Sequence, residues 1–532
     1  MRSRWVLVAA VLGSSIVFLD STVVNVALPT IGRELSSSYF GILEGQSYVY
    51  YGYLLTLSSL LILAGAMADR YGRRRLFFWG LWGFGGTSVL CGLAPNMDLL
   101  ILFRLLQGAA GAILVPGSLA IIVSSFSGAE QGRAFGVWAG ASAFTAILGP
   151  ALGGALISQM SWRVVFLINV PLVAIAVWAA RHIQESKDPD APERFDHLGA
   201  VLAVLGIGGL TFGVIRGQSS EWTGAIPYVA LVVGAVATAW FVVQIRRSSH
   251  PLVPPELFRS RNFTVTNIST FLIYGALYVM GQFMALYLIG TLRYNELAFG
   301  LAGIPGTLFL AFFSSRFGTL AAKHGPRIYM TVGPAVMGLG ILWFARIPSS
   351  TQGWSAHLSD ASSLVPPRDY LVDVLPAIVV FGIGLMIMVA PLTTALMRSV
   401  PVSHSGVGSA VNNAISRVGP QLAGALLFVA ISSTFYSALA SEAPQLDVST
   451  QELRQQIAPL NQPEDAEPAI VRAARVASTR SFHVAMFVTS LLCFVGAAVN
   501  GFGIRNEELH DHSAEEETSG PVLPPVPAET PG

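Results

Sequence analysis

The sequence predicts an all-α polytopic membrane protein. Hydrophobic residues make up 53% of its 532 positions and charged residues only 11%, whereas an ordinary soluble domain carries about 25% charged residues. The apolar residues gather in repeated runs of about 20, the length that an α-helix needs to cross a bilayer. A net charge of +1 without a basic patch argues against a nucleic-acid partner, so the expected surroundings are the lipid bilayer.

Fourteen of these runs follow one another in a pattern of six, two and six. The first is read as a retained span, because it is long enough to cross the bilayer and no small-residue cleavage site of a signal peptide interrupts it. The predicted spans are Trp5–Leu28, Val49–Ala68, Leu76–Ala94, Leu99–Ser124, Ala134–Ile157, Val164–Ala180, Leu198–Ile215, Ala225–Val243, Val265–Ile289, Leu297–Ser314, Ile328–Phe344, Leu371–Leu396, Val407–Ile431 and Phe482–Phe502.

This pattern divides the chain into four parts. Residues 1–185 form an N-terminal six-helix bundle, 186–250 a linker with two additional helices, and 251–505 a C-terminal six-helix bundle with an extracytoplasmic loop over 432–481. The tail 506–532 is rich in Glu and Pro and is expected to be disordered. An even number of spans puts both termini on one side, and the arrangement of Lys and Arg makes that side the cytoplasm of a cell-membrane protein.

Asp20 is the acid that falls deep inside an apolar run. A carboxylate there costs several kcal/mol unless it is protonated, paired or facing water, which suits it to take up and release a proton. A rise of about 1.5 Å per residue places Arg104 of the fourth span at the same depth, with Gln107 one turn further on. We expect the three to share one cavity and couple protons or substrate to transport. A permanent pair within the bundle, or an Arg104 that extends to the outer interface, remain open alternatives.

A short charged turn, GAMADRYGRRR, joins the second and third spans at Gly65–Arg75. Charge is cheap at the membrane surface, so this turn suits a cytoplasmic gate that makes and breaks ion pairs; a topology anchor is the alternative. A weaker copy, GTLAAKHGPR, occupies Gly318–Arg327. Ala322 stands there where Asp69 stands in the first turn, so a gate built on the acid would belong mainly to the first half.

Small residues recur every four positions in the fifth span and would let another helix approach closely. They are Ala141, Thr145, Gly149 and Gly153. Pro150, flanked by glycines that include Gly154, adds a bend. We interpret Gly149, Pro150, Gly153 and Gly154 as a hinge, with ordinary tight packing as the alternative.

Four segments resemble signature motifs of the major facilitator superfamily, in its fourteen-span drug:proton antiporter branch of EmrB/QacA type. They are LDSTVVNVALP (Leu19–Pro29), GAMADRYGRRR (Gly65–Arg75), RLLQGAAG (Arg104–Gly111) and LGPALGG (Leu148–Gly154). The resemblance runs from Trp5 to about Arg505. It implies two six-helix bundles that rock around a central cavity, with two added helices, and that export lipophilic compounds in exchange for protons.

The resemblance also implies roles for single residues. Asp20 takes the place of the coupling carboxylate and Arg104 that of the proton-relay arginine. The cytoplasmic gate comprises Gly65, Asp69, Arg70, Gly72, Arg73 and Arg133. Thr145 and Tyr48 depart from the family pattern, where glycine and tryptophan are usual.

Candidate cavity residues come from both halves. Tyr274, Tyr278 and Gln282 recur at four-residue spacing on one face of the ninth span, which suits a ligand pocket or ordinary packing. Asn25, Tyr53 and Asn412 complete the candidate set.

The energy for transport is not expected to come from ATP. The only lysines are Lys187 and Lys323, neither preceded by glycine, so the chain lacks a P-loop. Its histidines show no metal-ligand spacing, and we expect no cofactor, no metal and no enzymatic activity. We therefore predict a monomeric proton-coupled multidrug-efflux antiporter of lipophilic or cationic small molecules, associated with antibiotic resistance. An exporter of one metabolite, antibiotic or lipid, a passive facilitator or channel, and a membrane scaffold are the alternatives.

Overall fold

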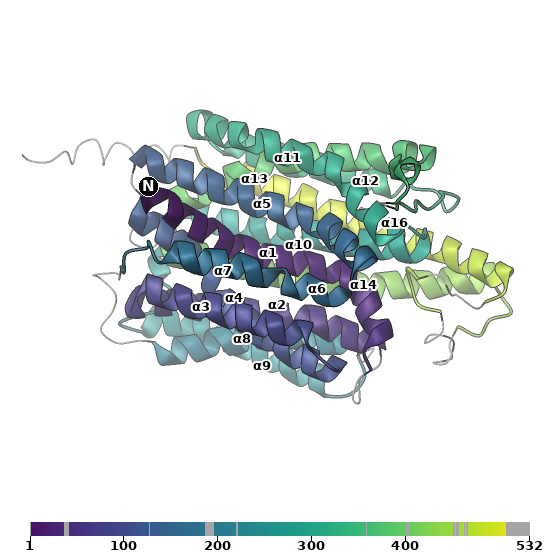
Figure 1. Ribbon diagram of the computed structural model, residues 1–532, viewed down its shortest axis with the longest axis horizontal. Coiled ribbons are helices and arrows are strands. Elements are labelled where there is room, and N and C mark those ends of the chain that lie inside the picture. The colour runs from purple at the N-terminus through teal and green to yellow at the C-terminus, as the bar shows by residue number, and fades with distance from the viewer. Residues whose placement is uncertain are drawn as a thin grey trace, which may run out of the picture.

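The computed structural model shows an all-α protein whose helices run side by side along the long axis of the molecule (Figure 1). It describes residues 2–36, 42–126, 128–186, 196–219, 222–357, 359–400, 405–448, 450, 453, 457–461, 463 and 466–506. Within these ranges the β-structure is limited to one bridge between His357 and Asp360. The predicted fold class is confirmed.

The first half of the chain folds into seven helical segments. They are α1 (Arg2–Glu34), α2 (Ile42–Tyr71), α3 (Arg73–Gly92), α4 (Met97–Ser125), α5 (Gly128–Gln159), α6 (Trp162–Leu167) and α7 (Asn169–Ala180). The sixth predicted span is therefore broken at Ile168. Pro171 lies three residues beyond Ile168 and lacks the amide proton that would bond back into the preceding turn.

The rest of the chain forms the remaining helices. They are α8 (His197–Ser219), α9 (Ile226–Arg247), η1 (Pro255–Arg259), α10 (Arg261–Ala285), η2 (Leu286–Thr291), α11 (Glu296–His324), α12 (Arg327–Phe344), η3 (Ala361–Leu364), η4 (Tyr370–Val374), α13 (Leu375–Arg398), α14 (Ser405–Glu442) and α16 (Pro468–Gly503). We call the end of the bundle at which α1 begins and α16 ends the terminal face, and the opposite end the distal face.

Each of the fourteen predicted spans lies in helix. Twelve stretches of the described residues have the length and composition to cross a membrane, and α3 and α5 are not among them. Both of these helices nevertheless pack lengthwise against helices that are, α3 on α4 and α5 on α1. The number of fourteen crossings stays a prediction.

Most of the apolar core is divided between the two halves, and a smaller buried cluster joins Ile62 of α2 to residues of α8, α9, α10, α13 and α14. The buried clusters of the first half draw on residues 6–183, whereas the large cluster of the second half draws on residues 273–504. The halves meet where α2, α4 and α8 pack against α14 and where α5 packs against α11. Two cores joined along a seam are what two rigid bundles require if they are to move against each other.

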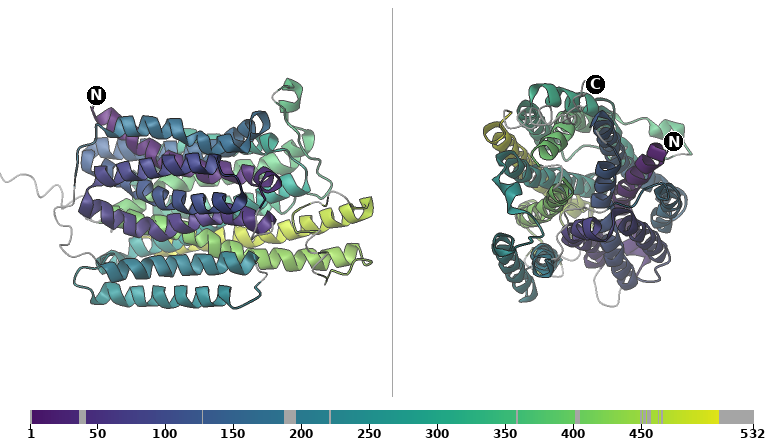
Figure 2. Two further views of the ribbon diagram at one scale, coloured as in Figure 1. Left: turned by 60° about the horizontal axis from the view of Figure 1, so that its bottom comes forward. Right: turned by 90° about the vertical axis from the view of Figure 1, so that its left-hand side faces the viewer.

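The helices α8 and α9 form a hairpin at the side of the molecule (Figure 2). Their backbones approach closely, because a Cβ on Gly209 would lie 2.9 Å from the Cα of Gly234. α8 also packs against α2 and α14, so the hairpin lies against both halves.

The segment 432–481, predicted as a loop, is helical at both ends. α14 continues to Glu442 and α16 begins at Pro468, so the two helices extend beyond the rest of the bundle on the distal face (Figures 1 and 2). Phe435 and Leu439 pack there against Ala474 and Ala477 in a small buried cluster. The loop prediction was wrong at these ends, because a helix pair that protrudes from a membrane needs only one apolar face. Of the predicted tail 506–532, only Asn506 lies within the described residues.

The two halves repeat one turn. Gly72 between α2 and α3 has φ +113°, and Gly325 between α11 and α12 has φ +83°, a region that favours glycine. These glycines occupy matching positions in GAMADRYGRR and GTLAAKHGPR. The internal similarity of sequence therefore corresponds to a shared backbone conformation.

Gly108 sets the closest approach of α4 to α2. A Cβ at this position would collide with Thr56 Oγ1 and with the carbonyl oxygen of Tyr53. Thr56 Oγ1 also donates a hydrogen bond of 2.8 Å to the carbonyl of Leu105. This contact holds Arg104 and Gln107, on the same helix as Gly108, next to α2.

We expect Gly108→Ala to destabilise the protein by about 1–3 kcal/mol, because overpacking forces the two helices apart. The midpoint of thermal unfolding of the purified protein in detergent measures the effect. Gly86→Ala is the matched control: a Cβ at Gly86 meets nothing within 4 Å, so its midpoint should be unchanged or slightly higher. Equal midpoints for Gly108→Ala and the wild type would contradict the role given to this contact.

Candidate functional site

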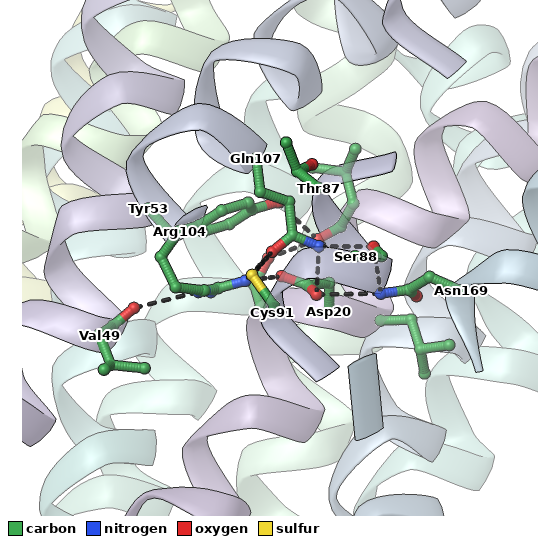
Figure 3. Close-up of polar contacts among 12 residues, drawn as sticks. Asp20, Val49, Tyr53, Thr87, Ser88, Cys91, Arg104, Gln107 and Asn169 are labelled. Carbon is green, nitrogen blue, oxygen red and sulfur yellow. Dashed lines mark hydrogen bonds and ion pairs between the residues drawn. The ribbon is translucent and has the colours of Figure 1, made fainter. Parts of the chain in front are cut away.

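Asp20 lies in a closed polar cluster inside the first half (Figure 3). Its side chain is completely buried, as is that of Arg104. The cluster draws on α1, α3, α4 and α7, four helices whose packing is otherwise apolar. A charge enclosed in this way persists only if it is paired and hydrogen-bonded.

Arg104 supplies the countercharge to Asp20. Its Nη1 donates to Asp20 Oδ2 at 2.5 Å and to Gln107 Oε1 at 2.7 Å, and its Nε donates to the carbonyl of Val49 at 3.1 Å. The guanidinium carbon lies 4.1 Å from the centre of the Tyr53 ring. Arg104 is therefore anchored to α1 by charge and to α2 by a carbonyl and a ring.

Two amides complete the surroundings of the carboxylate. Gln107 Nε2 donates to Asp20 Oδ1 at 3.1 Å and to Ser88 Oγ at 2.8 Å. Asn169 Nδ2 donates to the same Asp20 oxygen at 3.0 Å and to Ser88 Oγ at 3.3 Å. One oxygen of Asp20 thus accepts from arginine and the other accepts from two amides.

The structure brings Asp20, Arg104 and Gln107 together at one depth, in a sealed cluster rather than in the cavity that the sequence predicted. Arg104 does not extend to the outer interface, because its side chain is fully buried. Tyr53, assigned from the sequence to the substrate cavity, belongs to this cluster instead. It is fully buried beneath Arg104, and its hydroxyl donates to the carbonyl of Val17 at 3.3 Å.

Two atoms of the cluster have no hydrogen-bond partner among the described residues. They are Arg104 Nη2 and Asn169 Oδ1, one donor and one acceptor. An unpaired buried polar atom costs about 1–3 kcal/mol. The observed arrangement therefore leaves one donor and one acceptor of the cluster unused.

Asn169 and Ser88 are site residues that the sequence analysis missed. Asn169 is the polar residue within the apolar run VVFLINVPLV and begins α7 after the break at Ile168. A buried amide in a span is a recognisable signal. Ser88 gave none, because serine is common on helix faces of every kind.

Three of the predicted gate residues, Arg70, Gly72 and Arg73, lie at the turn between α2 and α3. The backbone N–H of Arg73 donates to the carbonyl of Ser186 at 3.1 Å, and the Arg70 guanidinium lies 5.9 Å from the ring centre of its neighbour Tyr71. Gly65 faces α14, since its Cβ would lie 3.5 Å from Ala410 Cβ. The side chains of Asp69 and Arg133 lie outside the described residues.

Glu185, which follows α7, holds this turn and was not predicted. Its Oε1 accepts from the N–H of Arg74 and its Oε2 from the N–H of Arg75, each at 3.1 Å. The carboxylate thereby accepts hydrogen bonds from two of the free backbone amides at the start of α3. Its negative charge also interacts favourably with the partial positive charge at the N-terminus of this helix. A Cβ on Gly72 would lie 2.7 Å from the same carboxylate.

The predicted hinge glycines are points of close helix contact. A Cβ on Gly149 would collide with Thr22 Oγ1, and one on Gly153 would lie 3.0 Å from Val23 Cγ1, both on α1. A Cβ on Gly154 would lie 2.9 Å from the carbonyl oxygen of Glu296 on α11. α5 therefore contacts α1 of its own bundle through Gly149 and Gly153, and α11 of the other bundle through Gly154. The side chain of Pro150 lies outside the described residues.

The other cavity candidates separate into two groups. Tyr274 and Tyr278 lie with ring centres 6.3 Å apart on α10, and Gln282 Nε2 donates to the Tyr51 hydroxyl of α2 at 2.5 Å. These three line the seam between the halves. Asn412 instead donates to Asn267 Oδ1 at 3.0 Å and to Thr270 Oγ1 at 2.9 Å within the second half, and Asn25 is half-buried on α1.

Among the described residues, no group of three His, Cys, Asp or Glu side chains is placed to hold a metal ion. The Asp20 cluster offers one carboxylate, one guanidinium and the neutral polar groups of Gln107, Ser88 and Asn169.

Comparison with known proteins places the chain in a family. Residues 10–424 match the family described as Major Facilitator Superfamily. The multidrug resistance protein Stp of Mycobacterium tuberculosis is 31% identical over 422 residues, which cover 79% of this chain and 74% of that protein. The puromycin resistance protein pur8 of Streptomyces alboniger is 32% identical over 434 residues, covering 80% and 81% of the two chains.

Further likeness extends to another resistance protein and to solved structures. The methylenomycin A resistance protein of Bacillus subtilis is 30% identical over 437 residues, which cover 81% of this chain and 89% of that protein. The structure of an auto-inhibited POT family peptide transporter superposes with a TM-score of 0.60 at 15% identity, covering 94% of this chain and 96% of that one. A bacterial homologue of the human lysosomal transporter Spinster, inward-facing and unoccupied, gives a TM-score of 0.56 at 15% identity and covers 94% and 97%.

Twelve stretches of the described residues have the length and composition of membrane spans, and the family match covers most of the chain. The chain therefore belongs to the Major Facilitator Superfamily and is a multi-pass membrane transporter, not an enzyme.

Proposed function

We propose that the protein is a proton-coupled efflux antiporter of lipophilic small molecules, of the fourteen-span drug:proton branch, that works by alternating access. The observation that carries the proposal is the buried ion pair between Asp20 and Arg104. Relatives named for multidrug, puromycin and methylenomycin A resistance support the direction of transport and the kind of substrate.

A proton that arrives at Asp20 would remove half of the ion pair. Breaking a buried pair by neutralising one partner costs about 3–5 kcal/mol, because the other charge stays buried without compensation. Arg104 would then favour a conformation in which water or another group reaches it. Protonation thus biases the packing of α1 against α4.

Asn169 is placed to accept a hydrogen bond from Asp20 once that acid is protonated. Its Oδ1 has no partner while its Nδ2 donates to Asp20. Rotation of this amide by half a turn would present Oδ1 to accept a hydrogen bond from a protonated Asp20. The residue therefore matches both protonation states, and its position at the break between α6 and α7 connects the change to the backbone.

The proton gradient supplies energy of the same order as the cost of breaking the ion pair. One elementary charge moving through a membrane potential supplies about 2.3 kcal/mol per 100 mV, and a pH gradient adds to it. The cost of opening the pair is of the same order, so one proton at Asp20 would supply a large part of it when the potential and the pH gradient act together.

The remaining assignments complete the proposal. The turn with Gly65, Asp69, Arg70, Gly72 and Arg73, together with Arg133, forms a gate at the cytoplasmic face, and the glycines of α5 with Pro150 form the surface on which the halves tilt. The protein acts as a monomer in the cell membrane with both termini in the cytoplasm.

Asp20→Asn tests the coupling. The amide keeps the shape of the carboxylate but has only one acceptor oxygen, so it cannot accept from both Arg104 and the two amides, and it cannot exchange a proton at neutral pH. We expect proton-gradient-driven efflux in proteoliposomes to fall to the rate of protein-free vesicles, while a thermal unfolding scan still shows a folded protein. Acidified vesicles that lose their gradient on addition of candidate compounds provide the measurement.

Glu34→Gln is the control on the same helix. Glu34 lies at the distal end of α1 and accepts from Trp162 Nε1 at 2.8 Å, so its loss should leave coupling intact. If Asp20→Asn retains gradient-driven transport, the proton site lies elsewhere. Downhill flux that ignores the gradient in the wild type would instead indicate a passive facilitator.

Asp69→Asn tests the gate. Ion pairs that form in only one state change the rate of interconversion and leave binding nearly untouched. We expect the transport rate at saturating substrate to fall about tenfold, which corresponds to about 1.4 kcal/mol, with less than about a twofold change in Kd. Glu256→Gln, an exposed acid in η1, serves as the control. An altered Kd with an unchanged rate would rule out the gate assignment.

A further inference from the structure

Arg417 of α14 is a buried cation at the seam between the halves. Its side chain is only 6% exposed, yet its guanidinium carbon faces two rings from different bundles. It lies 5.3 Å from the ring centre of Phe18 on α1 and 5.8 Å from that of Tyr278 on α10. Among the described residues, no carboxylate lies within ion-pair distance of it.

The surroundings of Arg417 are aromatic. Tyr50 of α2, itself buried, lies near Arg417 and Tyr278, and Tyr274 of α10 lies near both as well. Rings stabilise a cation through their faces, but they do not neutralise it. The seam therefore presents a positive charge within an apolar and aromatic setting.

Gln421 gives a second, independent indication of a ligand. It lies one turn beyond Arg417 on the same face of α14, and its side chain is 5% exposed. Among the described residues, neither its Oε1 nor its Nε2 has a hydrogen-bond partner. Buried amides without partners are rare in folded proteins, so this one indicates a site for a polar ligand.

The sign of the charge decides the class of occupant. The buried acid of the first half, Asp20, is already paired with Arg104 and cannot attract a cation to the seam. A cationic substrate would approach Arg417 without compensation, whereas an anion would gain a charge-assisted hydrogen bond. The tyrosines would at the same time receive an aromatic body.

We propose that the seam between the halves binds the anionic group of an amphipathic aromatic substrate through Arg417 and Gln421, with Tyr50, Tyr274 and Tyr278 around its apolar part. This inference rests on the proposed export function and defines its substrate class. The sequence analysis left cationic substrates open. The site at the seam instead favours carboxylates, sulfonates and similar anions.

A matched pair of probes tests the sign of the charge. The sulfonate 1-anilinonaphthalene-8-sulfonate and its neutral parent N-phenyl-1-naphthylamine share one aromatic body, and ethidium supplies a cation. Equilibrium dialysis against the full-length protein in detergent yields the three Kd values. We expect the sulfonate to bind at least about tenfold more tightly than the neutral parent and ethidium to bind more weakly than either.

Variants assign the preference to Arg417. Arg417→Gln should make the affinities for the sulfonate and its parent equal, Arg417→Lys should keep most of the difference, and Gln421→Leu should reduce it. Arg316→Gln is the control, because Arg316 also faces a ring, that of Phe313 at 5.2 Å, but on the exposed side of α11. It should leave all three Kd values unchanged.

Three results would overturn the site: a wild type that binds the neutral parent or ethidium as tightly as the sulfonate, a sulfonate preference that survives Arg417→Gln, or an equal effect of Arg316→Gln. If Arg417→Gln does not fold, the Kd values of the wild type, Arg417→Lys and Gln421→Leu still decide whether the site exists.

Transport in proteoliposomes separates the failure of this site from the failure of the export function. Gradient-driven export of a neutral or cationic probe alone would preserve the function and remove the site, whereas sulfonate binding without export would do the reverse.

Discussion

The ion pair between Asp20 and Arg104 is the constraint on which the arrangement of the first bundle depends. Both side chains are fully buried and 2.5 Å apart, so neither helix can turn or slide without exposing a charge to apolar surroundings. The pair thus fixes the rotation of α1 against α4. Gln107, Ser88 and Asn169 extend this constraint to α3 and α7. A structure held in this way is stiff while the carboxylate is charged and loosens when it is not.

The sequence predicted much of this site because helix geometry converts residue number into depth. Asp20 and Arg104 came out at one level from the rise per residue alone, and Gln107 followed from the spacing of one helical face. Rotation about the helix axis is a different quantity, and hydropathy does not encode it in spans that are apolar on every side. This is why Tyr53 was assigned to the substrate cavity although it faces Arg104, and why Asn169 and Ser88 were missed. The length of α14 and α16 escaped for another reason: apolar windows detect the part of a helix within lipid and not the part beyond it.

The two polar regions of the transporter differ in their charge balance. The Asp20 cluster is compensated and enclosed within one bundle, whereas Arg417 at the seam contacts both bundles and carries its charge without an acid. A balanced site suits a switch whose occupant is a proton. An unbalanced site between moving parts suits recognition of a charged cargo, since its surroundings change as the halves tilt. Tyr50 and Tyr53, on one helix, lie near both Arg104 and Arg417, so α2 lies between the two regions.

The repeated glycine turns have a mechanical consequence. In the first half Glu185, just after α7, holds the start of α3; in the second half Asn506, just after α16, accepts from the N–H of Arg327 at 3.4 Å at the start of α12. In each bundle, a residue that follows the last helix is thereby hydrogen-bonded to the start of the third helix. This contact connects the end of the bundle to its interior helices. The connecting segment that carries α8 and α9 contributes to neither of these two contacts, so each bundle is closed by residues of its own.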